Sequence, residues 1–237
     1  MQFDPPLMQG VLLRRYQRFL ADVALADGRQ ITVHCPNTGS MKHCNAPGSA
    51  VLFSDSGNGA RKYRHTLEAV ATPSGAWAGI NTARANALVE EGLQQALVPA
   101  LDGYRAWRRE VRYGMENSRI DFLLQQHASA PDCYVEVKNV TLEEDARQVC
   151  FPDAVTERGT RHLRELMAMR ALGLRAVLFF CVQHSSAVIV SPARTIDPLY
   201  AATLEEAVAA GVEVVAMGAE ISAQQIALRR VINFQLE

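Results

Sequence analysis

The chain has 237 residues, of which 49% are hydrophobic and 21% are charged, and its formal net charge at pH 7 is −1. This length and apolar content predict an ordinary soluble fold with one large domain or two small ones. Five scattered cysteines disfavour a disulfide framework, and neither a charged-then-apolar leader nor a run of ~18–20 apolar residues occurs, so we expect a cytoplasmic protein without a membrane partner.

Residues 1–82 have the pattern of a small β-barrel. Phe19–Leu25 alternates up to Asp27-Gly28, a hairpin signal, and Gln30–His34 resumes the extended pattern. Further short strands are expected over Val51–Phe53, Tyr63–Ala71 and Trp77–Ile80. About five short strands in this length suit an OB fold, a five-stranded barrel that binds oligonucleotides.

Cations and aromatic residues are mixed along this segment, as in a groove on which single-stranded nucleic acid stacks. The cations are Arg14, Arg15, Arg18, Arg61, Lys62 and Arg64. A solvated strand surface above core tyrosines explains the same composition, and both interpretations stay open.

Two His-Cys pairs, His34-Cys35 and His43-Cys44, have the ligand chemistry of a zinc site. Zinc sites normally separate paired ligands by two to four residues, and adjacent side chains on a strand point to opposite faces, which disfavours zinc here. The residues between the pairs, Asn37–Ser40, form a polar loop that either contacts phosphate or is a simple turn.

The periodicity changes after Thr82, and residues 83–237 predict a second domain in which helices and strands alternate. In chain order we expect a helix over Ala83–Leu101, strands over Glu110–Tyr113, Arg119–Leu124 and Cys133–Val140, a helix over Thr156–Leu172 ended by Gly173, a strand over Arg175–Val182, and late elements over Leu204–Ala210 and Val212–Met217. The continuous apolar run of Arg175–Val182 is typical of a central strand covered on both faces.

Two of these strands carry a set of residues that suits metal-dependent phosphodiester chemistry. Period-two alternation separates Ile120, Phe122 and Leu124 from Asp121, and Val135 and Val137 from Glu136 and Lys138. If the two strands form a hairpin, Asp121 lies beside Glu136 and Lys138. An acid in the intervening turn, Asp132, is too near the strand end to meet Glu136 in this way.

Asp121 and Glu136, with the carbonyl oxygen of Val137, would supply oxygen ligands for Mg²⁺ or Mn²⁺. Such an ion polarises a scissile phosphate and activates a bound water, and Lys138 would orient the water or stabilise the developing charge. Lys138 is one of only three lysines among 24 basic residues. The alternative is a surface ion pair between Glu136 and Lys138.

The start of the second expected helix gathers Asp153, Thr156, Glu157, Arg158 and Arg161. Free amides at a helix N-terminus bind phosphate, and the two arginines, three residues apart, share a face that could hold a nucleic-acid backbone. Capping with local ion pairs explains the same residues.

Several segments resemble the bacterial sugar fermentation stimulation protein A family. They are His34–Met41, Ser118–Leu124, Tyr134–Val140, Phe151–Gly159 and His162–Leu166. The resemblance covers nearly the whole chain. It implies an α+β or α/β fold in which an OB-like β-barrel precedes a PD-(D/E)xK nuclease-like domain, with a mixed central sheet flanked by helices. It also implies largely sequence-nonspecific DNA binding. The signature's proline is replaced by Ile120, which precedes Asp121.

The resemblance further implies an accessory metal ligand on the first helix. Glu91 stands at that place, although Glu90 could face the site instead, and either could be an ordinary exposed helix glutamate.

Two function classes follow. The first is a Mg²⁺- or Mn²⁺-dependent nuclease that acts on single- or double-stranded DNA. The second is a non-catalytic DNA-binding regulator of sugar metabolism of the maltose type. Residues 1–72 carry six Arg and two Lys against five acids, and residues 104–120 carry five Arg against two Glu, so each zone has a balance of +3 and predicts weak, salt-sensitive binding. DNA against RNA preference and oligomeric state stay open.

Overall fold

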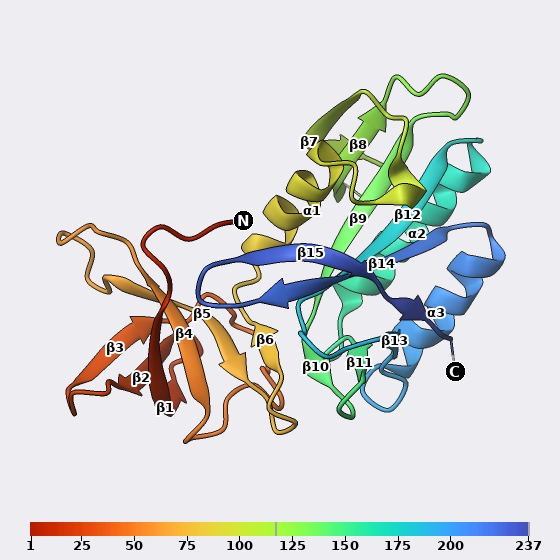
Figure 1. Cartoon of the computed structure of the whole chain (residues 1–237). Helices are drawn as coiled ribbons and strands as arrows, with labels where there is room; N and C mark the ends of the chain where they lie inside the picture. Colours follow the sequence, from red (N-terminus) through yellow and green to blue (C-terminus); the bar gives the residue numbers. More distant parts are fainter. Residues whose placement is uncertain (117, 237) are drawn as a thin grey trace.

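Six strands near the N-terminus form one sheet that closes into a barrel (Figure 1). Its strands are β1 (Met8–Tyr16), β2 (Leu20–Ala24), β3 (Gln30–His34), β4 (Ala50–Asp55), β5 (His65–Ala71) and β6 (Trp77–Gly79), in the order β3-β2-β1-β4-β5-β6. An additional pairing of β3 with β5, through His34 and Thr66, closes the sheet. The structure is a computed structural model that describes residues 1–116 and 118–236.

The hairpin expected at Asp27-Gly28 is confirmed. β2 and β3 pair antiparallel from Leu20–His34 to Ala24–Gln30, and Gly28 takes the left-handed conformation (φ +85°) that the turn needs. Alternate residues of the strands point inward and fill the barrel core, which includes Leu12, Val23, Val33, Phe53, Leu67 and Ile80. The chain therefore begins with an OB-like barrel, as predicted.

A second six-stranded sheet, mixed in direction, forms the rest of the molecule. Its order is β15-β14-β12-β9-β8-β7, made by β7 (Ala106–Tyr113), β8 (Ser118–Gln125), β9 (Cys133–Val140), β12 (Arg175–Val182), β14 (Glu213–Ile221) and β15 (Ile226–Val231). β12 pairs parallel with both β9 and β14 and is buried along nearly its whole length. The prediction of a central strand over these residues is confirmed.

Helices cover both faces of this sheet. On one face α1 (Arg84–Gln94) packs Leu88 and Val89 against a core that includes Phe122, Val135 and Phe179. On the other face α2 (Glu157–Ala171) and α3 (Pro198–Ala209) bury Leu163, Leu166 and Leu204 against Leu178 and Phe180. No helix among the described residues is long and apolar enough to cross a membrane.

The first helix is shorter than its composition predicted. It ends at Gln94 instead of Leu101, because Ala96 adopts a left-handed conformation (φ +52°) and the Leu97 amide bonds the Gly92 carbonyl oxygen at 2.8 Å. A separate 3₁₀ turn, η1 (Pro99–Leu101), follows. The late helix begins at Pro198, earlier than expected, since the Asp197 side chain accepts the Tyr200 amide and caps it.

Besides the strand β15 (Ile226–Val231), which no expected element covers, two features were not predicted. The first is a small sheet of order β10-β11-β13-β16, made by β10 (Leu142–Glu143), β11 (Gln148–Phe151), β13 (Ile189–Pro192) and β16 (Asn233–Phe234). The second is the path of residues 1–7, which run beside the β14–β15 hairpin instead of joining the barrel (Figure 1). The Phe3 amide bonds the Gln224 carbonyl oxygen at 2.8 Å, and the Leu7 amide bonds that of Ala223 at 2.7 Å.

Candidate functional site

The strands β8 and β9 pair along only part of their length, and they separate at the predicted site. The paired residues are Leu124 with Cys133, Leu123 with Tyr134 and Phe122 with Val135. At the next position the Asp121 carboxylate accepts the backbone amide of Val137 at 2.7 Å. A side chain thus takes the place of a ladder bond, and the strands open around the acid.

This separation overturns one prediction about β8. Alternation placed Ile120 on the same face as Phe122 and Leu124, but Ile120 packs in the core beside α2 whereas the other two pack in the core beside α1. Once Asp121 leaves the ladder, the regular pleat no longer fixes which face the preceding residue takes. On β9 the alternation holds, because Val135 and Val137 pack on the α1 side.

Asp121 is held by hydrogen bonds to both of its oxygens. Oδ2 accepts the Val137 amide, and Oδ1 accepts Asn86 Nδ2 of α1 at 2.7 Å. Burial raises the pKa of Asp121 and the charge of Glu136 adds to this effect, against the hydrogen bonds from Val137 and Asn86 and the charge of Lys138. The carboxylate is therefore fixed in position, but burial and the neighbouring charge of Glu136 make its ionised form less favourable.

Glu136 is the most buried acid of the site, with 3% of its side chain exposed. Its Oε1 accepts a hydrogen bond from the Lys138 ammonium at 2.6 Å and also contacts Nδ1 of His162. Its Oε2 is buried and has no hydrogen-bond partner among the residues that the structure describes. Burial by itself raises the pKa of Glu136, but Lys138 and His162 outweigh burial and hold this pKa below its ordinary value. One charged oxygen is thus left open to a further partner.

Both acids line one cavity of about 520 Å³, together with Val137 and Lys138. The other walls come from several elements: Asn37 of the barrel, Thr82, Ala83, Ala85 and Asn86 at the start of α1, Arg109 of β7, Asn139, Thr141, Leu142, Cys150 and Phe151 of the strands β9 to β11 and the link between them, and Asp153 and Arg158 near the start of α2. The residues predicted on two strands therefore share a cavity, and cations approach it from both sides.

The polar loop Asn37–Ser40 of the barrel closes one side of this cavity. Ser40 Oγ donates to Asp153 Oδ2 at 2.9 Å, and the Met41 amide lies 3.3 Å from the same oxygen. The Arg15 guanidinium fixes the loop by donating hydrogen bonds to the carbonyl oxygens of Asn37 and Gly39. This loop is a contact between barrel and sheet, and its Asn37 reaches the site.

The acid predicted as an accessory ligand does not reach the cavity. Glu91 pairs with the N-terminal ammonium of Met1, and it is absent from the cavity walls. Its neighbour Glu90 accepts Trp107 Nε1 at 3.2 Å and Arg109 at 2.9 Å. The position on α1 that faces the site is Asn86, one turn earlier, so the assignment to Glu91 is wrong.

Only one of the two predicted arginines on α2 lines the cavity. Arg158 does so, and its Nε donates to His162 Nε2 at 3.3 Å. Arg161 does not, and its Nε is buried without a partner. The helix N-terminus thus presents a single cation to the site.

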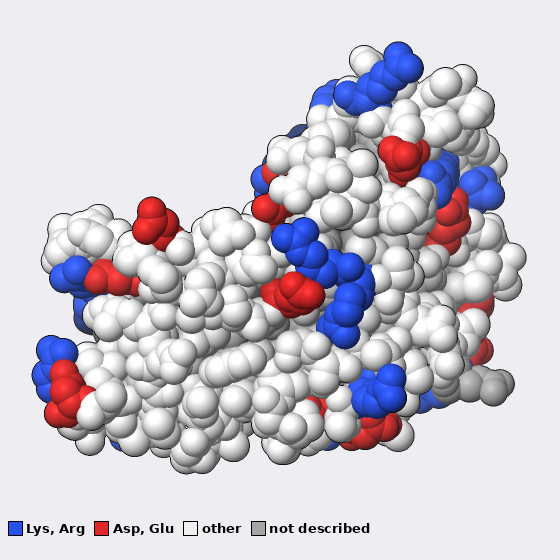
Figure 2. Space-filling view, viewed as in Figure 1, with Lys and Arg blue, Asp and Glu red and all other residues white. Residues whose placement is uncertain are grey.

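The barrel cations fall into two groups. Three are engaged within the protein: Arg14 pairs with Asp22 at 2.7 Å, Arg64 with Asp55 at 2.6 Å, and Arg15 with the loop described above. The other three, Arg18, Arg61 and Lys62, are exposed. Arg61 and Lys62 line a shallow cavity of about 220 Å³ with His34 and Tyr63. On the face shown in Figure 2 charged side chains of both signs lie in small groups between uncharged surface.

The His-Cys pairs form no metal site. His43 Nδ1 donates to the Glu143 carbonyl oxygen at 2.7 Å. The Cys44 thiol lies 3.7 Å from the carbonyl oxygen of Thr141. All five cysteines are free and buried. In the described part of the chain, no three His, Cys, Asp or Glu side chains gather into a metal-binding cluster. A cation between Asp121 and Glu136 would need backbone, water or substrate oxygens as well.

Of the residues that contact the two acids, Asn86 and His162 were not predicted from the sequence. Both lie on helices and reach the acids across the sheet. His162 had a usable signal, because it lies four residues after Arg158 on a predicted helix and therefore shares its face. Asn86 had none.

The chain was compared with known proteins. The model of the sugar fermentation stimulation protein RE domain matches residues 83–225, and the model of the SfsA N-terminal OB domain matches residues 13–80. A solved structure described as Pyrococcus furiosus SfsA in complex with Ca²⁺ is 28% identical, with a TM-score of 0.86 over 99% of this chain and 98% of that one.

Curated relatives are closer in sequence. The sugar fermentation stimulation protein homolog of Teredinibacter turnerae is 57% identical over 232 residues, which are 98% of each chain. The homolog of Shewanella baltica is 56% identical over 228 residues, 96% of this chain and 97% of that one. With two matching domain models and relatives of this identity over nearly its full length, the chain belongs to the sugar fermentation stimulation protein A family.

Proposed function

We propose that this protein is a divalent-cation-dependent nuclease, built as an OB-like barrel, residues 1–82, on a PD-(D/E)xK-like domain, residues 83–237. The observation that carries the proposal is the unpartnered Oε2 of Glu136, a buried carboxylate oxygen in the same cavity as Asp121. A buried charged oxygen without a partner is costly, and a bound cation removes that cost.

The donors around this oxygen fit a hard cation. Asp121 and Glu136 offer only oxygen, which Mg²⁺, Mn²⁺ and Ca²⁺ prefer over nitrogen or sulfur. The carbonyl oxygen of Val137 remains our expected third ligand. The solved structure of the Pyrococcus furiosus relative is a complex with Ca²⁺, which supports the same class of ion. When bound, such an ion supplies a Lewis acid for the phosphate and an activated water.

The chain's own groups have separate tasks in this proposal. Lys138, with 12% of its side chain exposed, points its ammonium to Glu136 and can stabilise charge on a phosphate in the cavity. Arg109 and Arg158 line the walls and are suited to hold neighbouring phosphates. The nucleic-acid strand would be held on the barrel by the exposed cations Arg18, Arg61 and Lys62.

A non-catalytic DNA-binding protein that influences sugar use is the second candidate, and the contact of Lys138 with Glu136 and His162 favours it. A lysine already engaged by two partners is less available to a substrate. We assign either activity to a reducing compartment, the cytoplasm, because all five thiols are free.

The test incubates labelled single-stranded and duplex DNA and RNA with the protein and Mn²⁺, beside Asp121→Ala and Glu136→Gln. We expect cleavage by the wild type and a loss of at least about 100-fold in each variant. Asp132→Ala is the matched control, since Asp132 pairs with Gln125 outside the cavity. It should cleave like the wild type. Binding without cleavage in the wild type would favour the regulator instead.

A further inference from the structure

A second cavity, of about 270 Å³, adjoins the first. Leu142 and Cys150 line both cavities. The remaining walls come from Lys42 and His43 of the barrel, from Glu143, Glu144 and Gln148, and from residues 191–196. A linear polymer bound in the first cavity could therefore extend past Leu142 and Cys150 into the second cavity.

The charged groups of this second cavity leave one cation open. The Lys42 amide lies 3.3 Å from Ser40 Oγ, while its ammonium has no hydrogen-bond or ion-pair partner within residues 1–116 and 118–236. Arg194 is held by Glu205 and by the Leu236 carbonyl oxygen. Glu143 and Glu144 also line the cavity, so its two acids balance Lys42 and Arg194. The Glu143 carboxylate is engaged by Thr72 and Ser74, which leaves the Lys42 ammonium as the main anchor for an anion.

The neutral groups suit a nucleotide better than a free anion. Nδ1 of His43 donates to the Glu143 carbonyl oxygen, so Nε2 is the ring nitrogen that remains for a polar group of a ligand. Leu142, Ala193 and Ile196 provide apolar surface for a sugar or base. The volume lies just below the range of about 300–1,000 Å³ found for drug-sized ligands, so it fits a single unit of a polymer.

We propose that the second cavity binds the nucleotide next to the one held at Asp121 and Glu136, on the same strand, with its phosphate on Lys42. This inference rests on the proposed function. The barrel loop that carries Lys42 then contacts the substrate. The affinity is expected to increase with the number of nucleotides in the bound nucleic acid.

The experiment measures affinity by fluorescence anisotropy in Ca²⁺, with thymidine 5′-phosphate and a thymidine octanucleotide as probes, the mononucleotide by competition. Lys42→Ala should weaken the octanucleotide and reduce the slope of log affinity against log salt by about 0.7, the value for one phosphate contact on a single strand. It should leave the mononucleotide unchanged, because that probe needs the first cavity alone. Thr195→Trp, at an exposed position on the wall, should also weaken only the octanucleotide.

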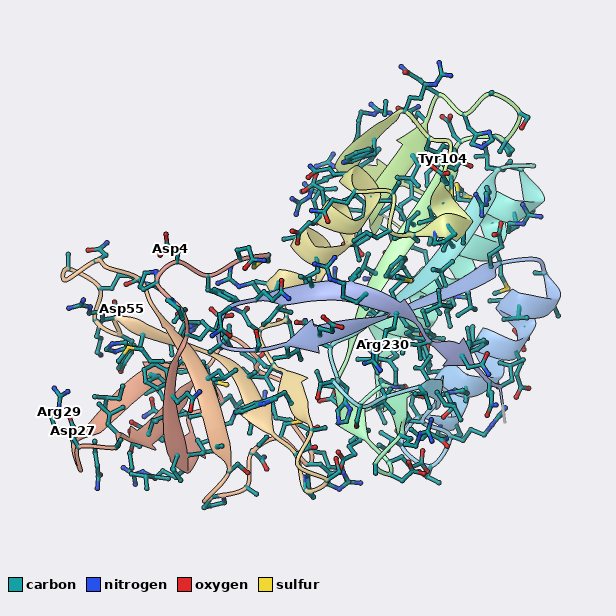
Figure 3. The ribbon with its side chains drawn as sticks, viewed as in Figure 1. Asp4, Asp27, Arg29, Asp55, Tyr104 and Arg230 are labelled. Atoms are coloured by element: carbon teal, nitrogen blue, oxygen red, sulfur yellow. The ribbon has the colours of Figure 1, made fainter. Side chains whose placement is uncertain are left out.

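The matched control is Arg29→Ala, which removes an exposed cation at the tip of the β2–β3 hairpin, remote from the second sheet (Figure 3). Equal losses of octanucleotide affinity in Lys42→Ala and Arg29→Ala would overturn the inference, because both losses would then come from the change in the protein's overall charge. If the wild type binds the octanucleotide with an affinity that Asp121→Ala reduces, but neither Lys42→Ala nor Thr195→Trp has an effect, this inference alone fails. If the wild type binds neither probe, the proposed function fails as well.

Discussion

A single buried carboxylate, Glu136, organises the site at the scale of residues. Taking a carboxylate out of water costs several kcal/mol unless partners compensate. Lys138 and His162 both contact one oxygen of Glu136 and leave the other without a partner. His162 is itself buried and touches Arg158, so it links the acid to the cation at the start of α2. It is placed to orient Glu136 and does not line the cavity itself.

We expect His162→Leu to weaken Ca²⁺ or Mn²⁺ binding by about 10- to 100-fold, the usual effect of removing a partner that orients a metal ligand. His162→Asn should restore part of this affinity, because its amide nitrogen can take the place of Nδ1 beside Glu136. Isothermal titration with the metal measures both variants. His127→Gln, at a histidine that packs on Tyr104 away from the site, serves as control. Unchanged metal affinity in His162→Leu would contradict this role.

The sequence could predict the site residues that lie on strands. Asp121, Glu136 and Lys138 were found because a strand's period of two places them without knowledge of any other element. The helical partners Asn86 and His162 depend on how each helix is rotated over the sheet, which tertiary packing decides. Glu91 was misplaced for the same reason, since its side of α1 turns toward the N-terminal residues.

At the scale of elements, the N-terminus of α2 is fixed by a cap shared with α3. Thr156 Oγ1 accepts the Gly159 amide at 3.0 Å, and the Thr156 amide donates to Asp197 Oδ2 at 2.8 Å. The other oxygen of Asp197 accepts the Tyr200 amide at 2.9 Å and caps α3. One buried acid therefore sets the start of two helices, and with them the place of Arg158.

Asp197→Ala should lower the free energy of unfolding by about 2–4 kcal/mol, because it removes a helix cap and leaves a second buried amide unpaired. Thr156→Ala, which removes one cap bond, should cost about 1 kcal/mol. Urea unfolding measures both. Asp145→Ala is the comparison, since Asp145 also accepts two backbone amides but does so in an exposed turn. A cost no greater for Asp197→Ala than for Asp145→Ala would argue against the shared cap.

Several long elements have the bounds that the sequence predicted, although α1 ends earlier, β7 begins earlier and β15 was not expected. The strands Cys133–Val140 and Arg175–Val182 have the predicted bounds, and α2 lies within one residue of its expected ends. The strands β10 and β16 have two residues each, too few for any periodicity, and they exist because β11 and β13 offer them partners. The end of α1 depends on the left-handed conformation of Ala96. An alanine does not predict this conformation, which glycine or asparagine normally adopts.

At the scale of the whole molecule, a buried acid of β10 joins the barrel to the small sheet. The Glu143 carboxylate accepts hydroxyl bonds from Thr72 and Ser74 of the barrel, each at 2.5 Å, and contacts His184 Nε2 at 3.1 Å. His184 is fully buried. Arg230 of β15, labelled in Figure 3, donates to the Ser185 carbonyl oxygen at 2.8 Å, and its charge adds to burial in lowering the pKa of His184. The junction therefore ties the β5–β6 turn of the barrel to β10.

This junction should weaken in acid. Burial lowers the pKa of His184, and although burial raises that of Glu143, bonds from Ser74, Thr72 and His184 outweigh it and lower that pKa too. Both groups thus bind protons more readily in the unfolded chain, so stability rises with pH and falls as pH drops below about 6.5, the ordinary value for histidine.

Urea unfolding at about pH 8 and about pH 5 measures this loss. His184→Gln removes the histidine's titration and should flatten the dependence between these values, whereas His65→Gln, on the barrel beside Asp55, should leave it as in the wild type. An equal acid loss in His184→Gln would contradict the assignment.

The three lysines have a consequence for covalent regulation. Lys138 lies in the first cavity, Lys42 in the second and Lys62 in the shallow cavity of the barrel, while every other basic side chain is an arginine. An enzyme that acetylates lysine would find side-chain targets nowhere else on this chain. Each acetyl group would remove a positive charge from one of the three hollows, so the modification would act on ligand binding directly, without a change of fold.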